Sequence, residues 1–217
     1  MELFKYLHPM WADRMVREGA IRVGTLYDFR RTEALDSERG DANEGIRISL
    51  TDGAPGIVEG KDLPWFVRQS LNVPPNVKIL FAEGAVLKVH QNVPDAYVYC
   101  TCSKFDKSLM QLFGGACVRI VDSTPFFAAI TQALDGWDAN GIRNISGFQL
   151  SPCEYVDREQ TWPNVSEYHP AFRKPPKYSH QSEVRAIWTT TATSISPKNL
   201  GVPVIRSWCE RFTERAA

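Results

Sequence analysis

The chain has 217 residues, with 25 basic and 25 acidic side chains and a hydrophobic content of 43%. This length suits one substantial domain, and the balanced charge excludes a global basic field that would drive tight, nonspecific nucleic-acid binding. No apolar stretch is long enough to cross a bilayer, and the first residues lack a signal-peptide pattern. Five cysteines without framework spacing indicate reduced thiols, so we expect a cytoplasmic protein that does not act at a membrane.

The N-terminal part predicts a strand, a helix and a second strand in succession. Residues 3–6 form the first strand. Pro9 and the apolar stripe that follows it predict a helix that ends at Gly19. Residues 20–26 alternate as a second strand, and residues 27–45 are polar and predict a long loop with charges of both signs.

The middle of the chain predicts short strands and helices in irregular order. A helix over residues 62–71 should turn Trp65 and Phe66 inward, and a hairpin is predicted from residues 77–81 and 85–90 around Glu83-Gly84. We expect a short helix at residues 105–113 and further strands at residues 45–50, 97–103 and 116–121.

The C-terminal half continues this pattern. Ser123 or Thr124 should cap a helix that runs through Trp137, and Ser207 should cap a terminal helix. Strands are expected at residues 145–156, 178–190 and 202–205. About nine short strands thus interleave with four or five helices, which predicts a single α+β domain over residues 1–217 with mixed or antiparallel sheets.

The strand over residues 178–190 carries the best indication of chemistry. Alternation places Gln181, Glu183 and Arg185 on one face, while Val184 and Trp188 lie on the core face. A carboxylate on a rigid strand can stabilise positive charge that develops on a sugar ring. The alternative is a solvent-facing strand or an internal Glu183–Arg185 ion pair.

Two other strands could contribute to the same site. Lys5 should oppose the aromatic side chains on either side of it. Tyr99, Thr101 and Ser103 should share one face of their strand, an arrangement of hydroxyls suited to ribose or phosphate oxygens. Solvent-facing polarity is the alternative for both strands.

Other patterns are less specific. The chain contains no Gly-rich phosphate loop, no GxGxxG and no GxSxG. Cys100 and Cys102 share a strand face that Cys117 could approach, but buried thiols are favoured over a zinc site and no metal ligand is assigned. The charged loop with Asp41 and Glu44 would suit a metal-dependent nuclease, although solvated loop charges are favoured there too.

Several short motifs resemble an uncharacterised bacterial family found near prophage and defence genes. They are the opening Leu-Phe-Lys-Tyr strand, Gly-Ala-Ile-Arg-Val, the acidic loop, Val-Tyr-Cys-Thr-Cys-Ser, the stretch from Leu109-Met110 to Val118, and Ser182-Glu183-Val184-Arg185. The resemblance covers most of the chain. It departs from the family where Gln111 follows Met110 in place of a tryptophan.

The order of elements also resembles, remotely, the ADP-ribosyltransferase fold. Those enzymes have a basic residue on an early strand, a Ser-Thr-Ser-like middle strand and a late catalytic glutamate, in several toxins within Gln-x-Glu. The resemblance implies Gln181 and Glu183 as the catalytic pair and Thr101-Cys102-Ser103 as the middle strand. Lysine in place of arginine or histidine, and cysteine within the hydroxyl triplet, are departures from the family.

The resemblance further implies NAD as the cofactor and an unidentified macromolecular target, either protein or nucleic acid. Glu183 would stabilise the charged ribose and Gln181 would orient the acceptor. The implied cofactor-binding residues are Lys5, Tyr6, Arg22, Thr101, Ser103 and Arg185. Two hypotheses compete with this one: a non-enzymatic phage or defence accessory protein that binds a protein partner, and a metal-dependent nuclease. The sequence leaves the oligomeric state open.

Overall fold

The computed structural model describes residues 1–33, 45–51, 53–136, 144–157, 159–161 and 168–213. Its centre is an antiparallel sheet of eight strands: β1 (Leu3–Leu7), β2 (Ala20–Thr25), β7 (Tyr97–Cys102), β8 (Ala116–Ile120), β9 (Ile145–Pro152), β13 (Glu183–Thr190), β14 (Lys198–Gly201) and β15 (Cys209–Phe212). The order is β14-β2-β7-β1-β8-β15, and β13 pairs with both β7 and β9. The fold is therefore mixed α/β with antiparallel sheets.

Two helices pack against one face of this sheet, namely α1 (Pro9–Glu18) and α5 (Ser123–Leu134). Apolar side chains on the strand face that points toward these helices complete the core. Met15, Phe126 and Trp188 are completely buried in it. The opposite face is covered in part by α2 (Leu26–Glu33) and α4 (Lys107–Leu112). Because β13 lies between these layers, its first six residues are buried on both faces.

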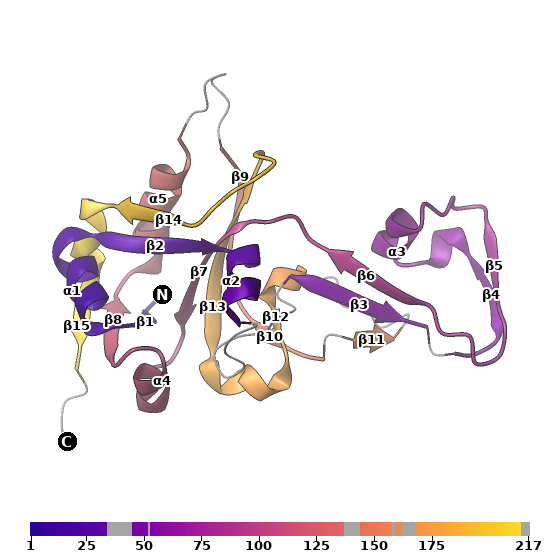
Figure 1. Ribbon diagram of the computed structural model, residues 1–217, viewed down its shortest axis with the longest axis horizontal. Helices are drawn as coiled ribbons and strands as arrows, with labels where there is room; N and C mark the ends of the chain where they lie inside the picture. Colours follow the sequence, from indigo (N-terminus) through magenta and orange to yellow (C-terminus); the bar gives the residue numbers. More distant parts are fainter. Residues whose placement is uncertain (34–44, 52, 137–143, 158, 162–167, 214–217) are drawn as a thin grey trace.

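The sheet is interrupted along one edge of β7, where two different strands pair with its two ends. On that edge β2 pairs with Tyr97 and Val98, whereas β1 pairs with Cys102. Within the described ladders, residues 99–101 have no partner strand on this side, so β1 and β2 separate (Figure 1). We call this gap the sheet opening.

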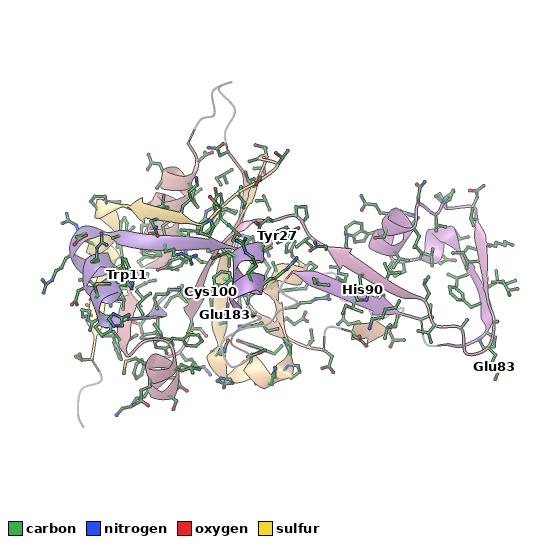
Figure 2. The ribbon with its side chains drawn as sticks, viewed as in Figure 1. Trp11, Tyr27, Glu83, His90, Cys100 and Glu183 are labelled. Carbon is green, nitrogen blue, oxygen red and sulfur yellow. The ribbon has the colours of Figure 1, made fainter. Side chains whose placement is uncertain are left out.

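A long arm projects from this body (Figure 1). Its near part is the three-stranded sheet of β11 (Glu159–Thr161), β3 (Ile46–Leu50) and β6 (Lys88–Asn92). Its far part is the pair of β4 (Gly56–Glu59) and β5 (Lys78–Phe81) with α3 (Trp65–Ser70). Glu83 lies at its far end in Figure 2.

Short elements connect the sheets. The strands β10 (Glu154–Tyr155) and β12 (Arg173–Lys174) pair in parallel. Short 3₁₀ helices are η1 (Gly60–Asp62), η2 (Pro170–Phe172), η3 (Pro176–Gln181) and η4 (Pro203–Trp208). In the described residues, no helix has the length and apolar content needed to span a membrane.

The sequence predicts the first three elements well. The strand, the helix from Pro9 and the second strand are all confirmed, and Gly19 ends the helix at φ +72°. A Cβ at this position would lie 2.3 Å from the carbonyl oxygen of Val202, so glycine is required there for space as well as for backbone conformation. The strands predicted at residues 45–50, 97–103 and 116–121 are confirmed as β3, β7 and β8.

Three predictions for the N-terminal and middle parts are wrong. The region predicted as a loop begins as α2, and residues 34–44, which include Asp41, lie outside the described residues. The predicted hairpin does not form, because β5 pairs with β4 and β6 pairs with β3. Trp65 is 53% exposed, and Val67 is buried in its place. The side chain of Phe66 lies outside the description.

The C-terminal half needs four corrections. The helix predicted to reach Trp137 ends at Leu134, and its cap is Asp122. The strand predicted over residues 145–156 is divided into β9 and β10. No strand covers residues 202–205, and no helix starts at Ser207 within the described residues. Instead η4 leads into β15, which pairs with β8.

Candidate functional site

A cavity of about 170 Å³ lies beside the sheet opening. Its wall contains four aromatic rings, three cations, one carboxylate, one amide and two thiols. These side chains belong to Phe4, Tyr6, Phe29 and Phe113, to Lys5, Lys174 and Arg185, to Glu183, to Gln181, and to Cys100 and Cys102. Cys100 and Glu183 lie next to each other at the centre of the molecule (Figure 2). We call this space the inner cavity.

Glu183 is buried in the wall of the inner cavity and bonded on both sides. Its Oε2 accepts a bond of 2.6 Å from Lys174 Nζ, and its Oε1 accepts one of 2.6 Å from Arg185 Nε. Burial alone would raise the pKa of this carboxyl, but the charges and hydrogen bonds of Arg185 and Lys174 outweigh it and hold the pKa well below its usual range. Glu183 is therefore ionised at every pH near neutrality.

Gln181 reaches the same cavity by a turn rather than along a strand. The strand predicted from residue 178 begins only at Glu183, because residues 176–181 form η3. Ser182 between them is left-handed, with φ 44° and ψ 44°. This turn lets Lys174 Nζ donate to Gln181 Oε1 at 2.8 Å as well as to Glu183. The predicted pair is thus brought together, although not by strand alternation.

Lys5 reaches into the sheet opening. As predicted, its side chain points away from those of Phe4 and Tyr6, which pack in the cluster around Leu109. Its Nζ donates to the carbonyl oxygen of Cys100 at 2.7 Å and lies 4.6 Å from the ring centre of Tyr99. The side chain thereby satisfies a carbonyl on the edge of β7 that no strand covers.

The predicted row of hydroxyls does not face Glu183. The antiparallel register sets Glu183 beside Cys102 and Val184 beside Thr101, so Thr101 lies on the packed face. Its Oγ1 donates to the carbonyl oxygen of Val184 at 2.9 Å, although the residue borders the inner cavity. The Tyr99 hydroxyl contacts Met15 Sδ at 3.7 Å.

Ser103 borders neither this cavity nor the larger groove described below. Its backbone N–H and its hydroxyl both bond to the carbonyl oxygen of Ser182, at 2.9 and 3.1 Å. Ser103 therefore holds the turn that separates Gln181 from Glu183.

Thiols replace hydroxyls on the face of β7 that looks into the cavity. Burial, followed by the charge of Glu183, raises the pKa of Cys102 to about 12 and raises that of Cys100 well above its usual value. Both therefore stay protonated. No group of three or more His, Cys, Asp or Glu side chains in the described part of the chain is placed to hold a metal ion.

A larger groove of about 580 Å³ lies on the other side of Lys5, between β1 with α1 and β2 with β14. Lys5, Phe29 and Cys100 border both spaces. Arg22 lies in the wall of this groove, where its Nη2 bonds to Asp28 Oδ2 at 2.6 Å. We call this space the outer groove.

The outer groove also has an aromatic side chain near its rim. Trp11 on α1 is 48% exposed, with the Arg14 guanidinium 5.1 Å from its ring centre. The volume of the groove falls within the ~300–1,000 Å³ of small-molecule sites. Two neighbouring spaces therefore share Lys5, Phe29 and Cys100 in their walls.

Of the remaining predicted residues, Tyr6 contributes its ring to the inner cavity, while its hydroxyl is engaged elsewhere. That hydroxyl accepts from the Asp106 N–H at 2.7 Å and contacts the Lys104 carbonyl oxygen at 3.2 Å. Arg185 borders the cavity but binds Glu183 and the Ala171 carbonyl oxygen. The internal ion pair that alternation allowed is thus present, inside a cavity rather than at the surface.

Lys174 and Phe29 are among the residues of this site that were missed from the sequence. Lys174 lies in a Pro-rich connection, and nothing in its neighbours marks it as buried. Phe29 lies in the region predicted as a loop. A turn of apolar spacing, Leu26 with Phe29, is the one signal that could have identified α2.

Comparisons with known proteins give no relative for this chain: no family model, no curated protein and no solved structure matches it. The two resemblances described from the sequence therefore stay predictions.

Proposed function

We propose that the chain is an ADP-ribosyltransferase-like enzyme that uses NAD to modify a macromolecular target, with Glu183 as its catalytic carboxylate. The observation that carries this proposal is one buried, ionised carboxylate in the wall of a cavity that a lysine from the first strand also borders. A cation from the first strand and an amide and a carboxylate from residues 181–183 border the same cavity. An ion pair that only stabilises the fold does not require a cavity beside it, whereas Glu183 and its partners border one.

The chemistry of the two spaces fits the parts of such a dinucleotide. NAD supplies a ribose whose bond to nicotinamide is activated for cleavage. Aromatic side chains in the wall of the inner cavity suit a planar ring, and Glu183 in the same wall would stabilise the positive charge that develops on the ribose. Lys5, at the junction of the two spaces, is positioned to pair with the pyrophosphate.

The outer groove would take the rest of the dinucleotide. Trp11 offers an exposed ring for stacking, and Arg22 brings a second cation to the same wall. In the inner cavity, Lys174 and Arg185 fix the orientation of Glu183. Gln181 is placed to contact the acceptor group, and Ser103 acts through the turn that it holds.

The proposal is tested by NAD binding and turnover. Saturating NAD should raise the melting temperature, and the enzyme should release nicotinamide. Glu183→Gln should lower that release roughly 100- to 1,000-fold, because the amide cannot balance the developing charge. Circular dichroism should show that the variant is folded.

Glu210→Gln is the matched control, since Glu210 is an exposed glutamate on β15 that bonds to Arg119 away from both spaces. It should leave release unchanged. A melting temperature that does not respond to NAD, together with no nicotinamide release, would refute the proposal.

A further inference from the structure

The inner cavity holds more positive than negative charge. Lys5, Lys174 and Arg185 line it together with a single carboxylate, Glu183. Glu183 bonds to Lys174 and Arg185, and no acidic partner is present for Lys5 in the described residues. A buried excess of charge is unfavourable unless an opposite charge accompanies it. The cavity is therefore suited to an anionic group.

Gln181 adds a hydrogen-bond donor that no described residue satisfies. The side chain is 3% exposed, and its Oε1 accepts from Lys174. Its Nε2 is buried and has no acceptor within the described part of the chain, and the residue borders the cavity. Buried amide donors are nearly always bonded, so this one indicates an acceptor that arrives with a ligand.

Lys5 and Gln181 are two polar groups of the cavity whose contacts with described residues leave donors unused. Lys5 Nζ has three N–H groups. One of them binds the Cys100 carbonyl oxygen, and the other two are left for the NAD pyrophosphate and for an acceptor in the cavity. Lys174 and Arg185 act mainly through their charge, because they already bond to Glu183, Gln181 and the Ala171 carbonyl oxygen. An oxyanion between Lys5 and Gln181 would meet donors on two sides.

Glu183 itself is poorly suited to remove a proton from an acceptor. Both of its oxygens accept charge-assisted bonds, and the neighbouring cations stabilise the ionised form. A hydroxyl or amine acceptor would need a base to deprotonate it during attack. An acceptor that is already ionised needs none.

We propose that the acceptor in this cavity is a phosphate monoester, bound by Lys5 Nζ and the Gln181 amide. This inference rests on the proposed function and names the substrate class of the same site. In the reaction, a phosphate oxygen forms a bond to the anomeric carbon of the ribose. The bond from that carbon to the nicotinamide nitrogen breaks, and its electron pair leaves with the neutral nicotinamide, so no proton has to move.

Binding is tested first without NAD. Inorganic phosphate, compared with chloride at equal ionic strength, should raise the melting temperature of the intact protein by about 5 °C at saturation. Gln181→Glu should lose this response, because the new carboxylate still accepts from Lys174 but repels the anion. Lys61→Ala, on the arm and outside both spaces, should keep it. An equal response to phosphate and chloride in the wild type would overturn the inference.

Turnover separates this inference from the proposed function. With NAD present, glycerol 3-phosphate should accelerate nicotinamide release at least about tenfold over glycerol, and mass spectrometry should find ADP-ribose on the phosphate. If NAD is cleaved equally fast with either compound, the phosphate acceptor is refuted and the transferase proposal stands. If NAD is neither bound nor cleaved while phosphate still stabilises the wild type and not Gln181→Glu, the transferase proposal fails and the anion site stands.

Discussion

Glu183 enters the inner cavity with both oxygens already bonded to cations. Removing any one of these three charged side chains would leave a buried charge without a partner, which destabilises the fold. The same arrangement ties the ionisation of Glu183 to folding. A carboxyl whose pKa is lower in the folded than in the unfolded chain stabilises the fold only where the unfolded carboxyl is also ionised.

The stability of the protein should therefore depend on pH through Glu183. The low pKa of the folded carboxyl contributes stability above its ordinary value of 4.5, and this contribution is lost as the pH falls below that value. Thermal unfolding between about pH 6 and pH 3 should show a steep decline for the wild type.

Glu183→Gln should start at a lower melting temperature and decline less steeply over the same range. Glu210→Gln again serves as the control and should follow the wild-type slope. Parallel curves for the wild type and Glu183→Gln would contradict the assigned ionisation.

Alternation along strands predicts part of this site from the sequence. It places Lys5 opposite its aromatic neighbours, and it places Glu183 and Arg185 on one face. It could not predict Lys174, because the partner of Glu183 comes from a two-residue strand whose position depends on distant pairing. Nor could it predict the left-handed turn at Ser182, since serine is not a residue that favours that conformation.

At the scale of elements, β13 is the strand on which both the site and the core depend. Its face opposite Glu183 carries Val184, Ala186 and Trp188 into the main core. Trp188 is 0% exposed and donates from its indole nitrogen to Thr131 Oγ1 at 2.7 Å. The register of the strand thus fixes at once which side chains face the cavity and which face the helices.

Truncation of the core side chain tests that register. Trp188→Ala should lower the free energy of unfolding by roughly 3–5 kcal/mol, because it removes a fully buried ring and leaves a cavity. Trp65→Ala, at a tryptophan that is 53% exposed, should change it by less than about 0.5 kcal/mol. Chemical denaturation measures both, and similar losses for the two variants would show that the register is wrong.

Local patterns predict elements better than they predict partners. The run around Glu83-Gly84 contains two strand-like segments and a turn, as a hairpin would, and Gly84 does adopt φ +74°. The strands nevertheless pair with β4 and β3, which come earlier in the chain. The predicted terminal helix fails for the same reason, since residues 209–212 gain a partner in β8 that their own sequence does not reveal.

At the scale of the whole molecule, the far part of the arm meets the near part at Thr51 and Leu87 and through Val67 of α3, which packs against Val89 of β6. The far part begins and ends where Thr51 and Leu87 bond to each other, at 3.1 Å between the Thr51 nitrogen and the Leu87 carbonyl oxygen. Its strands β4 and β5 belong to a separate sheet. Several of its large apolar side chains are exposed: Ile57, Trp65, Leu71, Val77, Leu80 and Val86.

Removal of the far part should therefore spare the site. A variant in which a short Gly-Ser linker replaces residues 53–86 should remain folded and show the same NAD-dependent rise in melting temperature as the full chain. The narrow junction at Thr51 and Leu87 is the reason, since the linker has only a short distance to span. A lost NAD response in a folded variant would mean that the arm takes part in binding.

The sheet opening has a thermodynamic consequence for the entire protein. An uninterrupted ladder along β7 would satisfy its edge with backbone partners, whereas here a single lysine ammonium stands in for a neighbouring strand. The central sheet therefore lacks backbone hydrogen bonds between strands along this part of β7. Both the inner cavity and the outer groove lie at this interruption, so the place where β7 lacks a partner strand is also the place of the proposed site.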